Sequence, residues 1–273
     1  MINSRQLYHL ELNGGRCQLA APAAELARYI DYYWVLFIDH PQLRLEVIPD
    51  TAVDLVMSPD LPDFAALYLP VSEPFEIELE GPICYIGVCF RSEYVESMVG
   101  QPLHALAQHC MGVETIEALR IQPLIADLQQ VTDPACVAAI ANGFWQSHLA
   151  EERAGAGLSS RNRAGHQTRI SHLQMMVALE ETAGAGSIAQ ISKTLGISER
   201  QLRRLSGDLF GLSPKQLQNT LRLQAALTEL FRCEPRQLLD LYYDDSHRIR
   251  ELKRLTGCTP TQIRRMAEKY NNP

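Results

Sequence analysis

The sequence has no apolar stretch long enough to cross a bilayer, so no membrane-spanning segment and no membrane partner are expected. Its first residues, MINSRQLYHLELNGG, lack a basic segment followed by an apolar one, and no signal peptide is predicted. It also lacks a His-x-His pair, a Gly-x-Ser-x-Gly motif and a phosphate-binding loop. We therefore predict no catalytic residues, no cofactor and no enzyme activity; a small-barrel enzyme is the least favoured alternative.

Cysteine and histidine are present but are poorly arranged for metal binding. The seven cysteines are odd in number and irregularly spaced, which favours reduced thiols in a cytoplasmic protein. Cys84 and Cys89 have an odd separation within one expected strand, so they should point to opposite faces. His104 and His109 miss the spacing of three or four that places ligands on one helical face. No metal site is predicted, and the cysteines are either core residues or a redox sensor.

Charge is distributed unequally along the 273 residues, which have a net charge of -7. Thr168–Pro273 carries 16 Lys+Arg against 11 Asp+Glu, whereas Met1–Gln167 carries 9 against 21. With 46% hydrophobic residues the chain can bury a core. The asymmetry predicts two domains with different partners, and only the rear one has the sign expected for binding a polyanion.

The composition divides the chain into residues 1–150, a segment 151–167 and residues 168–273. The middle segment, EERAGAGLSSRNRAGHQ, has no hydrophobic period and is predicted to be a flexible linker. Short runs rich in Val, Ile, Leu, Tyr and Phe precede it and predict strands, followed from about Ser92 by helical spacing. The expected fold class is α+β: a small barrel or cupin-like domain with following helices, then an all-α domain. The expected strands are LRLEVIPD, AVDLVMSP, FEIELEG and ICYIGVCF.

The most informative stretch is 187–211, SIAQISKTLGISERQLRRLSGDLFG. Apolar residues at helical spacing end at Gly196, where a left-handed residue would let the chain turn. Ser198 can cap a second helix, which turns leucines inward and arginines outward. Such a helix pair is typical of a helix-turn-helix, whose second helix enters the major groove, although a helical hairpin with a basic face would look similar. The outward residues are Arg200, Arg203 and Arg204.

A second helix pair is predicted further along the rear half. Ser213-Pro214 is a strong helix start, and that helix should run to about Arg232. The second pair would comprise 236–241 and 246–256, with Gly257 as its stop. Thr259-Pro260 opens a final short helix.

Two segments in the right order resemble the DNA-binding domain of AraC/XylS-type transcriptional regulators. The first is SIAQISKTLGISERQLRRLSGDLFGLSPKQLQNTLRLQAAL, and the second is YYDDSHRIRELKRLTGCTPTQIR. The front half resembles the N-terminal sensing or dimerisation domain of one subgroup, through Tyr33-Trp34, VIPDTAVDLVMS and GVCFRS. The resemblance implies a bacterial, cytoplasmic and nucleoid-associated transcription factor that binds promoter DNA. Its DNA-binding domain would contain two helix-turn-helix units joined by one long helix.

The resemblance also implies roles for individual residues. Arg200, Arg203 and Arg204 would face bases, and Ser198 would lie near the DNA backbone. In the second unit, Ser246, Ile249 and Arg250 would face the groove, and His247 and Lys253 would serve phosphates. RNA polymerase, a small-molecule effector and a second copy of the chain are further partners that the resemblance suggests.

The sequence departs from the family pattern mainly in the second unit. Arg248 replaces an apolar core residue, Asp245 stands where a neutral residue is usual, and Leu241 replaces a glycine. Ser206 stands where the first unit usually has a bulky apolar residue, which should loosen its packing. These departures predict that the first unit reads sequence and that the second contributes less. They also leave open a degenerate regulator that acts by capturing a protein partner.

Aromatic residues of the front half could line an effector pocket or simply form its core. The candidates are Trp34, Tyr33 and Tyr85, together with Asp54. Asp50 and Asp54 flank an expected turn, where carboxylates either bind a cation or polar effector or cap the turn.

Overall fold

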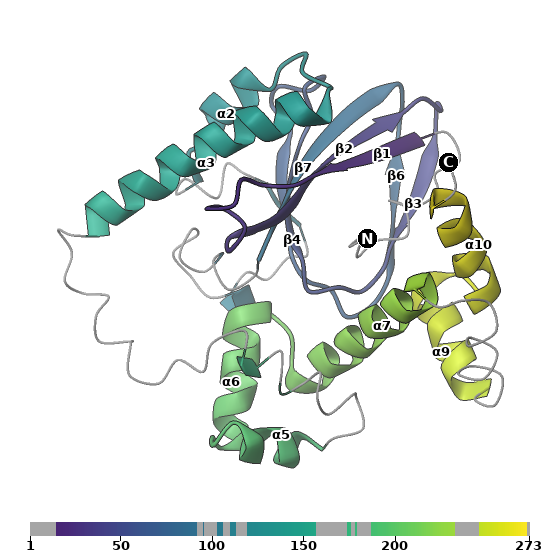
Figure 1. Ribbon diagram of the computed structural model, residues 1–273. Coiled ribbons are helices and arrows are strands. Elements are labelled where there is room, and N and C mark those ends of the chain that lie inside the picture. Colours follow the sequence, from purple (N-terminus) through teal and green to yellow (C-terminus); the bar gives the residue numbers. More distant parts are fainter. Residues whose placement is uncertain are drawn as a thin grey trace.

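A computed structural model describes residues 15–91, 95, 103–105, 110–112, 119–156, 174–175, 178, 187–232 and 246–271. The first part of the helical spacing expected from about Ser92 falls largely outside these residues, as do the predicted helix 236–241, Asp245 and most of the segment 151–167. Figure 1 shows a sheet-rich front part covered by helices on one side, with the rear helices packed below it.

The front part contains two antiparallel sheets. The larger sheet has the order β1-β2-β7-β4-β5-β8, and the smaller one pairs β3 with β6. All four strands expected from sequence are present, because each combines β-branched or aromatic residues with flanking turn residues. The strands are β1 (Gly15–Ala20), β2 (Ile30–Ile38), β3 (Leu43–Val47), β4 (Val53–Met57), β5 (Ala65–Tyr68), β6 (Phe75–Leu79), β7 (Ile83–Phe90) and β8 (Cys110–Gly112).

The two sheets do not close into a barrel among the described strands, which corrects the barrel expected from sequence. β3 and β6 pair only with each other, so their ribbon faces the larger sheet without joining it. The sequence pattern of strands and turns is the same for a barrel and for two facing sheets, because both bury one face of every strand.

Helices α2 (Gln122–Asp127) and α3 (Pro134–Ala156) cover the outer face of the larger sheet (Figure 1). The core between them centres on Trp145, which is 1% exposed and meets Phe90 edge to face with ring centroids 5.0 Å apart. Tyr33 of β2 joins this layer and donates its hydroxyl hydrogen to Asn142 Oδ1 at 3.0 Å. Burial raises the pKa of the Tyr33 hydroxyl, so it stays a donor at neutral pH.

The opposite face of the larger sheet looks toward the ribbon and carries Trp34, whose ring lies flat on Gly87. These residues are directly paired across β2 and β7. A Cβ atom on Gly87 would lie 1.9 Å from Trp34 Cε2, so only glycine leaves room for the indole.

The rear part is helical, as the sequence predicted. Gly196 and Gly211 both take the left-handed conformation, with φ of 66° and 68°, and end the first two helices. The helix that begins after Ser213 runs to Arg232, and Gly257, with φ of 66°, ends the helix before the last one. The helices are α5 (Ile188–Thr194), α6 (Glu199–Phe210), α7 (Pro214–Arg232), α9 (Ser246–Thr256) and α10 (Pro260–Asn271).

Two local expectations differ from the structure. α3 continues to Ala156, into the predicted linker, since Glu, Arg and Ala extend a helix readily. Residues 110–112 lie where helical spacing was expected from about Ser92, but they form a strand that pairs with Leu67 and its neighbours on β5.

Gly87→Ala should destabilise the protein by about 1–3 kcal/mol, because the added methyl group overpacks the strand beneath Trp34. Urea unfolding followed by tryptophan fluorescence measures this loss. Gly143→Ala is the control: a Cβ atom there meets nothing within 4 Å, and an alanine within a helix should stabilise by about 0.5–1 kcal/mol. Equal stability of Gly87→Ala and the parent would contradict the packing assigned to Trp34.

Candidate nucleic-acid interface and sheet pocket

Helix α6 is fixed at both ends by local sequence. The Ser198 side chain accepts a hydrogen bond from Gln201 N at 3.2 Å, and Gln201 Oε1 accepts one from Ser198 N at 2.9 Å. This capping box satisfies two of the free amides at the helix start. The same arrangement of Ser187 and Gln190 begins α5. The two helices of the first unit are therefore set by their own sequence before any partner is added.

The inner face of α6 is buried, and the opposite face carries the predicted base-reading arginines. The inward residues include Ser206, which is fully buried and donates its hydroxyl hydrogen to Leu212 O at 2.7 Å. Ser206 therefore stands in place of the usual bulky residue, and its hydrogen bond fixes the segment that follows α6. Arg200, Arg203 and Arg204 are all exposed.

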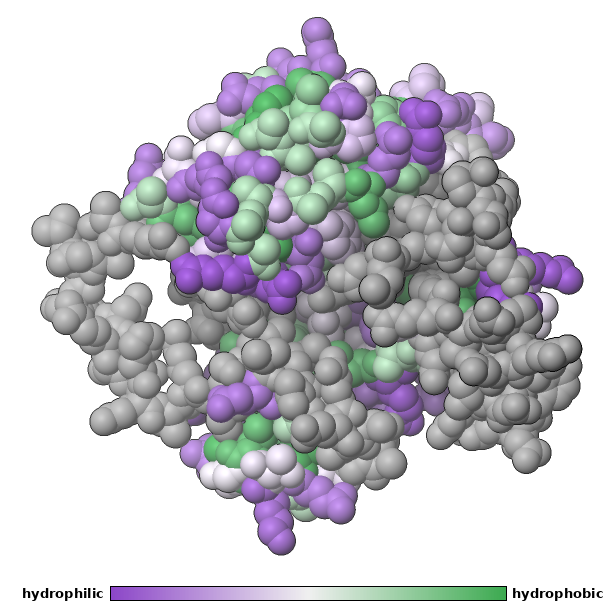
Figure 2. Space-filling view, in the orientation of Figure 1, coloured by the Kyte–Doolittle hydropathy of each residue, from purple (hydrophilic) through white to green (hydrophobic). Residues whose placement is uncertain are grey.

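Arg203 forms an ion pair with Glu199 one turn earlier on α6, with an N–O distance of 2.9 Å. Both side chains are largely exposed, so the pair contributes little to stability and opens at low cost. Arg203 can therefore leave the Glu199 carboxylate and contact a DNA phosphate or the edge of a base instead. Figure 2 shows hydrophilic side chains projecting from the lower end of the molecule, where α5 and α6 lie in Figure 1.

The described residues predicted as DNA contacts in the second unit differ in exposure. Arg250 and Lys253 on α9 are both exposed, which the predicted groove contact of Arg250 and the predicted phosphate contact of Lys253 require. Ile249 is half-buried and packs against the apolar residues of the neighbouring helices, so the structure does not place it on an open groove-facing surface. Ser246 and His247 lie in the first turn of α9, and their side chains fall outside the described part of the chain.

The front part inserts one side chain into the apolar cluster of the second unit. Ile48, which directly follows β3, is 0% exposed. It lies among six residues of α7, α9 and α10, which we call the rear cluster. Burying an isoleucine in this way contributes about 1.5–3 kcal/mol. The members of the rear cluster are Leu223, Leu227, Leu230, Leu252, Leu255 and Ile263.

Polar contacts surround the Ile48 contact. Gln224 of α7 donates an amide hydrogen to Pro49 O at 2.6 Å, and Gln216, at the start of α7, donates one to Ser72 Oγ at 3.0 Å. Arg254 of α9 forms an ion pair with Glu73. All of these front-domain partners lie in the two segments that lead out of β3 and into β6.

A separate contact joins the front part to the first unit. The short 3₁₀ turn η2 (Leu103–Ala105) lies on α6, where His104 Nδ1 is 3.0 Å from Asp208 Oδ1. Leu103 approaches Gly211, the residue that caps the end of α6, and His104 approaches Gly207 within it. A Cβ atom built on Gly211 would lie 3.6 Å from Leu103 Cβ, and one built on Gly207 would lie 3.5 Å from His104 Cβ. This contact is on a side of α6 that leaves the arginines exposed.

Glu46 of β3 reaches the turn between α9 and α10. A Cβ atom on Gly257 would lie 2.1 Å from Glu46 Oε2, so a side chain at position 257 would displace the flexible end of Glu46, and the positive φ of Gly257 also favours glycine. Burial, and then the neighbouring charge of Glu76, raise the pKa of Glu46. Burial and the charge of Glu46 in turn raise the pKa of Cys258.

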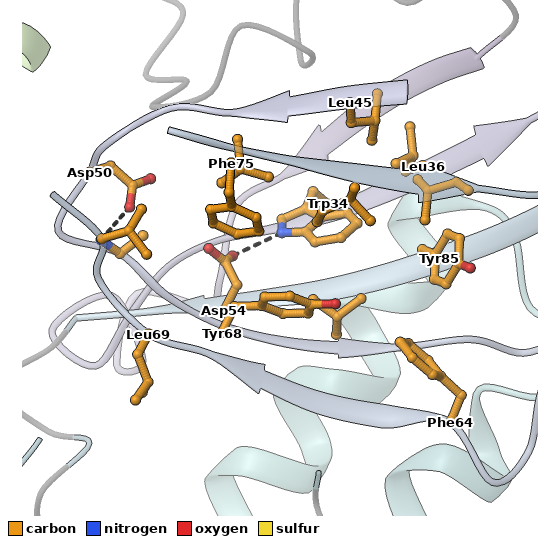
Figure 3. A pocket seen from close by; sticks show the side chains of 16 residues that line it. Trp34, Leu36, Leu45, Asp50, Asp54, Phe64, Tyr68, Leu69, Phe75 and Tyr85 are labelled. Atoms are coloured by element: carbon orange, nitrogen blue, oxygen red, sulfur yellow. Dashed lines mark hydrogen bonds between the residues drawn. The ribbon is translucent and has the colours of Figure 1, made fainter. Parts of the chain in front are cut away.

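A pocket lies between the larger sheet and the ribbon of β3 and β6 (Figure 3). It holds about 730 Å³ of free space, part of which is open to solvent. Its walls are mostly aliphatic and aromatic, which is typical of a small-molecule site. We call it the sheet pocket. Its lining residues are Trp34, Leu36, Leu45, Val47, Asp50, Ala52, Asp54, Val56, Phe64, Tyr68, Leu69, Val71, Phe75, Ile77, Leu79 and Tyr85.

Three of the four residues predicted for an effector pocket line the sheet pocket: Trp34, Asp54 and Tyr85. Trp34 Nε1 donates a hydrogen bond to Asp54 Oδ1 at 3.0 Å. Tyr33 does not line it, which corrects the prediction. Successive side chains of a strand point to opposite faces, so Tyr33 must face α3 when Trp34 faces the pocket.

Sequence reasoning missed Phe75 as a wall of the sheet pocket. The strict alternation of FEIELE was a usable signal, because it places Phe75, Ile77 and Leu79 on one face of β6. The alternation does not indicate which strands this face of β6 would contact. Asp50, considered for a turn cap or a ligand, does cap: its Oδ1 accepts a hydrogen bond from Ala52 N at 3.0 Å.

Cysteines and histidines form no metal site within the described residues, where no group of three or more potential ligands occurs. Cys84 and Cys89 lie in different apolar clusters on opposite faces of β7, as the odd separation predicted. His109 lies outside the described residues, as does the side chain of Cys110. No helix in the described part of the chain could span a bilayer.

Comparison with known proteins assigns the rear domain. A family model described as a helix-turn-helix domain matches residues 191–266, which span α6, α7, α9 and most of α5 and α10. Residues 191–266 form an AraC-type helix-turn-helix domain. The chain is therefore a DNA-binding regulator of transcription.

The front domain has its own match, and one solved structure aligns with most of the chain at a low TM-score. Residues 18–112 match a family described as a domain of unknown function (DUF6597). The crystal structure of ToxT from Vibrio cholerae O395 has 9% sequence identity and a TM-score of 0.38, over 95% of this chain and 99% of that chain. No curated protein sequence matches the chain.

Cys17 and Cys84 should resist alkylation by iodoacetamide in the native protein at pH 8. Burial raises the pKa of each thiol from 9.0 to about 12, with smaller contributions from Asp54 and Asp60 respectively. Such a shift lowers the thiolate fraction about a thousandfold. Peptide mapping by mass spectrometry measures the labelling, and Cys136, which is exposed although its hydrogen bond to Asp133 raises its pKa, serves as the accessible reference. Labelling of Cys17 as fast as Cys136 would contradict this burial and revive the redox-sensor hypothesis for Cys17.

Proposed function

We propose that this protein is a sequence-specific, one-component regulator in which α6 reads the major groove and the front domain senses a small molecule. The observation that carries the DNA-reading part is the face of Arg200, Arg203 and Arg204. They project from a helix that is capped at its start and buried on its other side. A helix is about 10–12 Å across and the major groove about 12 Å wide, so the two fit.

We assign the main sequence reading to α6 rather than to α9. In the described part of the chain, α6 meets the front part through η2 on the side of its glycines, whereas α9 uses Arg254 for Glu73 and packs Ile249 inward. Base contacts by Ser246, Ile249 and Arg250, and phosphate contacts by His247 and Lys253, remain predictions from the family resemblance. The binding site should then contain one strongly read block of bases, about as long as one major-groove segment.

The sensing part of the proposal rests on the continuity between the sheet pocket and the domain contacts. Leu45, Val47 and Asp50 line the pocket, while Ile48 and Pro49 between them contact the rear helices. An effector alters DNA binding only if it has unequal affinity for the docked and undocked arrangements. By linkage, DNA would change the effector affinity by the same factor.

The proposed partners are double-stranded promoter DNA and a small effector. Contact with RNA polymerase, and a homodimer, remain predictions from the family resemblance. The competing function is capture of a protein partner without sequence-specific DNA binding. Selection of binding sites from random DNA separates the two functions.

Selection of binding sites from random DNA by the full-length protein, near physiological salt, should enrich one motif. Arg203→Ala and Arg204→Ala should each weaken binding to that motif by about 1–3 kcal/mol and relax one base position, because a bidentate contact to a base edge is lost. Fluorescence anisotropy with the selected site measures the affinities. Affinity should fall steeply with added salt, as phosphate contacts release counterions.

Arg44→Ala is the matched control for these variants. Arg44 is an exposed arginine paired with Glu78 at 2.8 Å, as Arg203 is with Glu199, but it lies on the front domain. Its loss should leave DNA affinity unchanged. If Arg203→Ala and Arg204→Ala bind like the parent, α6 is not the reading helix. If the parent enriches no motif, sequence-specific reading is wrong for the free protein, and the protein-capture alternative gains support.

Ile48→Ala should destabilise the rear helices by about 2–5 kcal/mol, since it leaves a cavity inside the rear cluster. Differential scanning calorimetry should show an unfolding transition at lower temperature than in the parent. Leu61→Ala, which alters a side chain in a 45% exposed residue of the front domain, should leave the transitions unchanged. An Ile48→Ala thermogram identical to the parent's would mean that the two domains do not depend on this contact.

A further inference from the structure

The sheet pocket has one polar end, and its chemistry is specific. Asp54 of β4 is paired across the sheet with Tyr68 of β5 and bonded to the indole nitrogen of Trp34. In Figure 3 the Asp54 carboxylate lies between Trp34 and Phe75 on one side and Tyr68 on the other. A carboxylate is thus placed among three aromatic rings that come from three different strands.

The described lining of the sheet pocket is acidic. It contains two carboxylates, Asp54 and Asp50, and no lysine, arginine or histidine. The charge of Asp54 reaches beyond the cavity, since it adds to the burial that raises the pKa of Cys17. In a largely apolar surrounding such a field attracts a cation and repels an anion much more strongly than it would in water.

The aromatic rings favour the same kind of ligand. The face of a tryptophan, tyrosine or phenylalanine ring carries negative electrostatic potential and attracts an ammonium group. A carboxylate alone would also suit a hydrated metal ion, but metal ions require several ligands, and no group of three or more histidines, cysteines or carboxylates that could hold one occurs among the described residues. Rings and carboxylate together fit an organic ammonium ion.

The rest of the sheet pocket is apolar. Leu36, Phe64 and Tyr85 lie at the far end from Asp54 and Phe75 in Figure 3. Phe64 and Tyr85 meet edge to face, with ring centroids 5.6 Å apart. Such a wall suits an aryl or alkyl group and offers no charged partner to a second polar end.

We propose that the sheet pocket binds an organic ammonium ion with an apolar aryl or alkyl body. The ammonium group lies at Asp54 against Trp34, Tyr68 and Phe75, and the body extends toward Leu36, Phe64 and Tyr85. This rests on the proposed function only in taking the sheet pocket as the sensor site, and it adds the chemical class of the effector.

The test compares three probes of similar size on the full-length protein at pH 7 by isothermal titration calorimetry. The probes are phenethylamine, which is a cation at this pH, neutral 2-phenylethanol and anionic phenylacetate. Phenethylamine should bind at least about tenfold more tightly than either of the others, because only it gains from the carboxylate and the ring faces. Absence of phenethylamine binding, or phenylacetate binding of equal affinity, would overturn the proposal.

Two variants place the binding in the sheet pocket. Asp54→Asn keeps the size of the side chain and an acceptor for Trp34 Nε1 but removes the charge. It should weaken phenethylamine binding by at least about tenfold and change 2-phenylethanol binding by less than about threefold. Phe75→Leu keeps an apolar wall without a ring face, so it should weaken phenethylamine binding more than 2-phenylethanol binding. Equal affinity of both variants and the parent for phenethylamine would overturn the assignment to this pocket.

Asp63→Asn is the control for the charge change, because Asp63 is an exposed carboxylate in the turn before β5. It should bind all three probes like the parent. Thermal unfolding of each variant checks its fold, and the comparison of the three probes on the parent alone still decides the ligand class if a variant unfolds. Site selection on DNA is measured separately, so loss of DNA reading would leave this result standing, and failure of ammonium binding would leave DNA reading untouched.

Discussion

The alternation of strand β2 determines how the front domain is built on both sides. Tyr33 points to α3 and bonds to Asn142, and Trp34 points the other way, rests on Gly87 and bonds to Asp54. Because the pleat fixes this opposition, the helix layer and the sheet pocket share one strand. A shift of β2 by one residue would exchange the two faces and lose both hydrogen bonds at once.

One short segment also serves two contacts where the two domains meet. The residues that leave β3 alternate between the sheet pocket and the rear helices, with Val47 and Asp50 lining one and Ile48 buried in the other. A chain that bends at this point cannot move one set of side chains without moving the other. The sheet pocket is thereby connected to the helices of the second unit. The connection runs through residues that are neighbours in the chain and needs no long path of contacts.

Much of this arrangement could be predicted from the sequence. Four strands, the capped start of α6 and the stops at Gly196 and Gly257 followed from local patterns, since caps and turns depend on neighbouring residues alone. The exposed arginines of α6 followed from its 3.6-residue period. Trp34, Asp54 and Tyr85 were identified as pocket candidates, whereas Tyr33, named with them, faces α3.

What the sequence could not predict depends on contacts between distant segments. A single isoleucine after a strand carries no sign that it will be buried by helices of another domain, as Ile48 is. The open pairing of β3 with β6 is equally invisible, because alternation identifies a buried face without identifying what covers it. Ser206 was expected to weaken packing, and only the position of the Leu212 carbonyl shows that its hydroxyl is satisfied.

The close approach of Glu46 to Gly257 has a consequence for protein engineering. Residue 257 belongs to the DNA-binding half, yet the space for its side chain is occupied by a carboxylate of the other half. The two halves are therefore not freely interchangeable parts. A chimera that joins this front domain to a foreign helix-turn-helix domain with a side chain at the corresponding turn would have to move the Glu46 carboxylate, or carry a shorter residue in its place, for the graft to dock in the same way.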